Sequence, residues 1–144
     1  MTGSIIEAIS IALNAEFGDG YRVYPESVKQ DLKEPCFFIF CLNPTHEQFL
    51  GKRYVEQNSF VIQYLPESRY QPLMECNATA ERMKWCLEYI TSQEDGRPIR
   101  GTGMRYEVVD EVLNFFVDYD GFVIRVEPDE RMGNMESEIQ AKKG

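Results

Sequence analysis

The spacing of apolar positions changes along the chain, and it first predicts a helix near the N-terminal end. Apolar residues recur there at steps of three and four, as on one face of a helix over residues 5–16. Ser4 and Glu7 have the spacing of a capping box, which would satisfy the free amides at the helix start. Gly18 and Gly20 should end the helix, and residues 21–24 should form a short strand. The predicted apolar face consists of Ile5, Ile9, Ala12, Leu13 and Phe17.

The middle of the chain contains two segments with strand patterns. Residues 36–42 form an apolar, aromatic run that is too short for a buried helix, so they predict a central strand ending at Asn43-Pro44. Residues 52–65 partly alternate between apolar and polar, as expected of a long antiparallel strand. The two strands together predict a hairpin. Its tip should hold His46, Phe49 and Leu50, with Gly51 near the turn.

The strongest periodicity predicts a second helix over residues 70–91. Ser68 and Gln71 have the spacing of a capping pair, and Pro72 is tolerated in the first turn because its amide needs no helical acceptor there. Such a stripe, with methionine in it, is typical of a helix that faces a core. The predicted stripe consists of Leu73, Cys76, Ala80, Met83, Leu87 and Ile90.

The last third of the chain predicts a three-stranded meander at about residues 103–109, 112–119 and 122–126. Asp120-Gly121 is a favoured tight-turn dipeptide and should join the last two strands. Residues 1–127 are predicted to form one domain, and 128–144 a polar tail that is flexible or docks on a neighbour. The element order predicts an α+β fold, with two helices on a mainly antiparallel sheet that has a long central hairpin and a C-terminal meander.

Charge and composition exclude several classes of function. A net charge of -9 argues against sequence-specific nucleic acid binding, which depends on Lys and Arg meeting phosphates. Acidic residues concentrate between Glu107 and Glu138, where solubility and a surface that repels passing DNA are both open explanations. No apolar run is long enough to span a membrane, and no secretory leader is evident. Four cysteines without close-paired spacing fit a reducing cytosol.

The sequence contains no recognisable catalytic, cofactor or metal motif, so no enzyme activity is expected. Phosphate-binding glycine patterns are absent from the sequence, and the one histidine, His46, is expected to be a surface or turn residue. The acidic pairs Asp110/Glu111 and Asp118/Asp120 are expected to be solvated. The protein is therefore expected to function by assembling with other proteins.

Apolar and aromatic residues at the hairpin tip and in the polar tail predict a contact surface, because such residues are enriched at protein interfaces. The alternative is that Phe49 and Leu50 fold back over the sheet. The candidate interface residues are Phe49, Leu50, Arg53, Tyr54, Met132 and Met135.

The stretch from Ser27 to Ile39, a polar run ending in proline and followed by an aromatic strand, resembles the entry to the core sheet in small tail terminator proteins of long-tailed phages and prophages. With the hairpin, helix and meander that follow, the resemblance extends over about residues 5–126. It implies a structural protein that forms a ring, typically a hexamer, on the tail tube. The implied partners are further copies of the chain, the major tail tube protein and a head completion protein, with no cofactor. Assembly would take place in the host cytoplasm, and the protein would then remain at the head-proximal end of the virion tail.

Two alternatives to the terminator remain at this stage. Another neck component, such as a head completion or connector protein, would share the size, acidity and lack of chemistry. A small enzyme or ligand-binding domain with an unrecognised pocket is the alternative from a different class, and stabilisation by a metabolite or metal would identify it.

Overall fold

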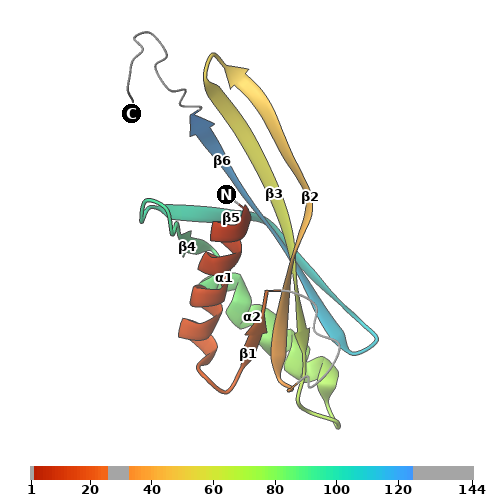
Figure 1. Cartoon of the computed structure of the whole chain (residues 1–144). Coiled ribbons are helices and arrows are strands. Elements are labelled where there is room, and N and C mark those ends of the chain that lie inside the picture. The colour runs from red at the N-terminus through yellow and green to blue at the C-terminus, as the bar shows by residue number, and fades with distance from the viewer. Residues whose placement is uncertain (1, 26–32, 125–144) are drawn as a thin grey trace. The chain divides into compact units, whose positions relative to one another are not determined.

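The computed structural model describes residues 2–25 and 33–124, with the side chains at positions 2, 43–45, 49 and 122–124 left undescribed. It contains two helices and six strands in these ranges (Figure 1). In chain order they are α1 (Thr2–Phe17), β1 (Arg22–Tyr24), β2 (Cys36–Leu50), β3 (Arg53–Leu65), α2 (Pro72–Cys86), β4 (Tyr89–Thr91), β5 (Pro98–Val109) and β6 (Val112–Ile124).

The strands form one sheet in the order β1-β2-β3-β6-β5-β4. β1 is parallel to β2, whereas β4–β5 and β5–β6 are antiparallel. β3 and β6 are also antiparallel, because Asn58 bonds to Tyr119 whereas Gln63, further along β3, bonds to Asn114, which comes earlier in β6. The predicted α+β class, with two helices on a mainly antiparallel sheet and a long hairpin, is confirmed.

Both helices pack on the same face of the sheet. β3 alternates as predicted, with Phe60, Ile62 and Tyr64 fully buried against the helices. The stripe of α1 is also confirmed, since Ile5, Ile9 and Leu13 are buried in the same core. Burial of such side chains contributes about 1.5–3 kcal/mol each. The other core residues are Ala8, Phe37, Ile39, Cys76, Ala80, Met83, Leu87, Ile90, Leu113, Phe115, Val117 and Tyr119.

The predicted helix starts differ from the observed ones. α1 begins at Thr2, so Ser4 and Glu7 lie inside the helix and do not form a capping box at its start. At α2 the cap position is Gln71, which makes no side-chain capping bond. Ser68 instead uses its hydroxyl oxygen to accept the Gln71 amide at 3.0 Å, in the turn that precedes the helix.

The second helix is also shorter than predicted, because residues 87–91 leave it. α2 ends at Cys86, and Tyr89–Thr91 form β4, which pairs with the start of β5. Leu87 and Ile90 still enter the core, so local periodicity located them correctly but assigned them to the wrong element. Leu73, predicted to be on the buried stripe, is 58% exposed.

The predicted turn at Asp120-Gly121 is wrong, because both residues lie within the continuous strand β6. Pairing with β3 holds this segment in the sheet, where the Asp120 carboxylate accepts the Asn58 amide at 3.3 Å. The turn before β6 lies at Asp110 and Glu111, which both have positive φ. The end of the predicted third meander strand, at residues 125 and 126, and the predicted tail at 128–144 lie outside the described residues.

The central hairpin is longer than predicted, because Asn43-Pro44 does not end β2. β1 pairs only with Cys36–Phe38, so the following part of β2 is an outer strand among the described elements. Proline is tolerated in an outer strand because its missing N–H need not face a neighbour. The turn lies at Gly51-Lys52, where Gly51 has a φ of 56°.

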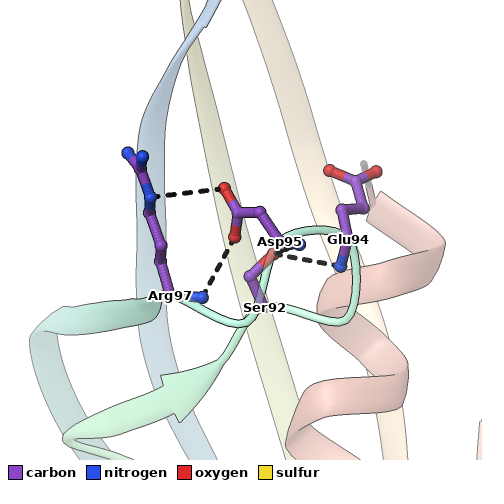
Figure 2. A network of polar contacts seen from close by, with 4 residues as sticks. All are labelled: Ser92, Glu94, Asp95 and Arg97. Carbon is purple, nitrogen blue, oxygen red and sulfur yellow. Dashed lines mark hydrogen bonds and ion pairs between the residues drawn. The ribbon is translucent and has the colours of Figure 1, made fainter.

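A polar network closes the connection between β4 and β5 (Figure 2). The Ser92 hydroxyl oxygen accepts the amides of Glu94 and Asp95, and the Asp95 carboxylate accepts the Arg97 amide at 3.1 Å. The Arg97 amide, and next the Ser92 hydroxyl, lower the pKa of Asp95. These bonds fix the direction in which β5 leaves β4.

The cysteine environments predict slow thiol chemistry in the folded protein. Burial, followed by the nearby Glu34 charge, raises the pKa of Cys36 to about 11, and burial raises that of Cys86 to about 12. At pH 9, near the ordinary thiol pKa, Cys36 should therefore hold far less thiolate when folded than when unfolded. We expect its alkylation by iodoacetamide to be at least about 50-fold slower without urea than in 8 M urea, as followed by peptide mass spectrometry. Equal rates would contradict this burial.

Candidate assembly surfaces

The outer part of the hairpin, His46–Glu56, is a compact unit with its own contacts. The His46 ring stacks on Tyr54 with 4.7 Å between ring centroids, and Nδ1 of the same ring lies 2.8 Å from the Glu56 carboxylate. Near the turn, the Gln48 side-chain amide donates to the Gly51 carbonyl at 2.8 Å. These contacts cross from strand to strand and fix the shape of the turn.

The turn carries apolar and positive groups together. Leu50 is 69% exposed, and Lys52 and Arg53 are exposed beside it. The segment from Leu50 to Tyr54 has no acidic residue, in a chain whose net charge is -9. The turn therefore presents an apolar side chain with two positive charges to its surroundings.

The structure brings together three of the predicted interface residues. Leu50 and Arg53 lie exposed at the hairpin turn, and Tyr54 is half-buried against His46. Phe49 lies in β2, but its side chain is outside the described set. Met132 and Met135 also lie outside the described residues, so the predicted contribution of the tail is untested.

A second surface is the face of the sheet opposite the helices. A groove runs over this face among residues of β2, β3, β5 and β6. Its walls include the aromatic side chains Phe38, Phe40 and Phe116, and Val109 beside them is 48% exposed. No described helix lies on this face, since α1 and α2 both pack on the other one. We call this hollow the sheet-face groove.

The sheet-face groove has a polar floor. The Gln63 side-chain amide donates to the Asn114 side-chain oxygen at 2.9 Å. One positive group lies near the groove, where the Arg105 guanidinium stands 4.5 Å above the Phe116 ring. The floor and walls thus combine aromatic surface with amide groups, as protein interfaces commonly do.

The rim of the sheet-face groove is acidic. Glu107 and Asp110 line it, and both are exposed. A neighbouring hollow shares Asp110 and adds Glu34 and Glu111, with Arg69 bonded to Glu34 at 3.5 Å. The groove is therefore suited to an apolar group that is accompanied by positive charge.

At both edges of the sheet, part of a strand has no described neighbouring strand. β1 pairs with only the first three residues of β2, and β4 with only the first three of β5. In β5 the pairing with β6 shifts between Thr102 and Arg105, where Gly103 has a φ of 61°. Open strands of this kind can accept a further strand from another chain.

Ile11, Trp85 and Tyr89 are each at least half exposed, and a shallow groove between α1 and β4 contains Ile11 and Tyr89. Tyr70 and Met74 are exposed near the start of α2. Apolar residues that fall off the buried stripe of a helix were the signal available in the sequence.

Residue types that can bind metal ions do not cluster in the described part of the chain. No group of three or more His, Cys, Asp or Glu side chains in residues 2–25 and 33–124 is placed to hold a metal ion. His46 pairs with Glu56 and not with a cysteine. The helices in the described part of the chain are too short or too polar to cross a membrane.

Comparison with known proteins finds one matching family model. A family model described as phage tail terminator protein matches residues 4–140. A search of curated proteins returned no match. One solved structure aligns over 89% of this chain and 95% of its own, with 6% identity and a TM-score of 0.37, a similarity too low to support any argument.

Proposed function

Because the chain belongs to the phage tail terminator family, we propose that it caps the tail tube, ends the polymerisation of the tube protein and provides the surface that joins the head. The observation that carries this proposal is the family match, which covers residues 4–140 and so nearly the whole chain. Membership gives a structural role in the phage tail, with contacts to other tail or head proteins. The capping and joining steps are the proposed part.

We infer that the protein acts as a ring, with six copies as the expected number. Neighbouring copies would be related by a rotation through a head-to-tail contact. When repeated rotation returns to the first copy, the result is a closed ring and not a filament. The open strand segments of β2 and β5 and the exposed hairpin turn support this arrangement, since each copy has several separate surfaces to offer. The partners would be the major tail tube protein and a head completion protein.

This proposal places the protein in the host cytoplasm during assembly and in the virion tail afterwards. It requires no cofactor and no catalytic residue, since capping depends only on complementary surfaces. Apolar and charged groups on the surface of the fold are sufficient for that role.

The test is to add purified protein to the tube protein of the same phage while the tube polymerises. We expect the mean tube length, measured by electron microscopy, to fall as the ratio of this protein to tube protein rises. Antibody labelling should place the protein at one tube end only. Unchanged tube lengths together with no labelling of the ends would refute the capping role.

A further inference from the structure

We propose that the hairpin turn of one copy docks in the sheet-face groove of the next copy in the ring. This inference rests on the proposed ring, and it assigns a pair of surfaces to the contact between neighbours. The inserted part is Leu50 with Lys52 and Arg53, and the receiving part is the groove between Phe40 and Phe116 with its acidic rim.

The turn and the sheet-face groove match in apolar surface. Leu50 is 69% exposed at the turn, so its apolar surface is available for burial against a partner. The sheet-face groove offers aromatic walls from Phe40 and Phe116, together with Val109, which is 48% exposed. Side chains that fill a well-packed pocket closed to water contribute most of the binding energy of a protein interface.

The turn and the sheet-face groove also differ in charge. Lys52 and Arg53 follow Leu50 on the turn, whereas Glu107 and Asp110 lie beside the apolar walls of the groove. Two basic groups oppose them, namely Arg105, whose guanidinium lies over the Phe116 ring, and Arg69 in the adjoining hollow, which lies 3.5 Å from Glu34. Together with Glu34 and Glu111 in the adjoining hollow, the rim has more acidic than basic groups. Opposite charges around an apolar contact favour one docking direction over others.

The two surfaces belong to one chain and are different from each other. A contact between two different patches is heterologous, so each copy can offer its turn to one neighbour and its groove to another. A second copy is therefore the occupant to which the chemistry points. The contacts among His46, Tyr54 and Glu56 would keep the turn in shape before it docks, which lowers the entropy lost on association.

The experiment uses two full-length proteins, in which the charge of the turn is reversed in one and the acidic charge of the groove rim is removed or reversed in the other. The turn variant carries Lys52→Glu and Arg53→Glu, and the groove variant carries Glu107→Lys and Asp110→Asn. Asparagine at 110 suits the positive φ of 51° at that position. All four side chains are exposed, so the thermal unfolding midpoint of each variant should stay close to that of the parent.

Alone, each variant should need at least about a tenfold higher concentration than the parent for half-assembly, as measured by native mass spectrometry. Mixed in equal amounts, the two should assemble together with the variants alternating, because each junction then joins opposite charges again. A control matched to the turn variant, Lys84→Glu with Arg97→Glu, makes the same charge change as that variant at exposed positions outside both surfaces and should assemble like the parent. Normal assembly of both single variants, or no recovery in the mixture, would overturn the proposal.

A photo-crosslinking amino acid at position 50 gives an independent result when the free protein is monomeric. With protein bound at tube ends and half of the copies isotopically labelled, crosslinks should join position 50 of one copy to the peptide around residues 107–116 of another. Crosslinks to the tube protein or to other peptides of the chain would refute the groove contact while leaving the capping role intact. Failure of the proposed function is recognised separately, by unchanged tube lengths.

Discussion

Replacing Gly101 by alanine should lower the free energy of unfolding by about 3 kcal/mol, at the upper end of typical overpacking effects. Gly101 is buried in β5, and an added Cβ would lie 2.7 Å from the Leu87 carbonyl oxygen and 2.9 Å from Val117 Cγ2. The Leu87 carbonyl cannot move away freely, because it accepts a hydrogen bond from the Tyr119 hydroxyl at 2.5 Å. The Gly101 amide also donates to the Glu88 carbonyl at 2.7 Å.

Urea unfolding followed by circular dichroism provides the measurement. Gly20→Ala is the matched control, since a Cβ there meets nothing within 4 Å and the backbone does not have a positive φ. This control should change stability by less than about 0.5 kcal/mol. A similarly small loss for both variants would mean that α2 and β5 do not approach each other as closely at Leu87 as described.

Glu75→Ala should also cost about 3 kcal/mol, because one carboxylate serves three donors. Glu75 Oε2 accepts the Tyr64 hydroxyl at 2.5 Å and the Glu67 amide at 2.8 Å, and Oε1 accepts the Ser68 amide at 2.8 Å. Removing the carboxylate leaves the hydroxyl of Tyr64, a fully buried residue, without this partner. It also releases the turn that leads into α2.

Two further variants separate the contribution of the Glu75 hydrogen bonds from that of its charge on the helix. Glu75→Gln keeps one carbonyl oxygen as acceptor and should lose about half as much stability as Glu75→Ala. Glu81→Ala removes an exposed carboxylate from the same helix, whose partner Lys84 lies 3.1 Å away, and should stay within about 0.5 kcal/mol of the parent. Equal losses at positions 75 and 81 would show that removing a negative charge from α2, and not losing the buried network, explains the effect.

Gly101→Ala and Glu75→Ala both weaken the packing of α2 on the sheet, and the sheet-face groove depends on that sheet. Gly101 lies where the end of α2 meets β5, and Glu75 ties the start of α2 to β3. The sheet-face groove is made by β2, β3, β5 and β6, so its shape requires these strands to keep their order. Weaker packing of α2 on the sheet should therefore weaken ring assembly as well as folding.

Sequence spacing by itself determined the elements in which a local pattern matches the buried face. The stripe of α1 and the alternation of Phe60, Ile62 and Tyr64 were predicted correctly, because a single face of each element enters the core. The hairpin and a turn near Gly51 were also predicted, since turn chemistry is local, whereas the sequence left open whether Leu50 is exposed or folds back over the sheet. Family membership came from soft patterns over most of the chain and is confirmed.

Only the tertiary structure decided the features that depend on pairing between distant segments. Residues 89–91 have the spacing of a helix but form a strand with β5, and Asp120-Gly121 has turn chemistry but is held straight in β6 beside β3. The sheet-face groove could not be predicted either, because the continuous apolar run 36–42 does not say which face of β2 the helices cover. Propensity is worth less than about 1 kcal/mol per residue, so tertiary packing and strand pairing override it where they compete.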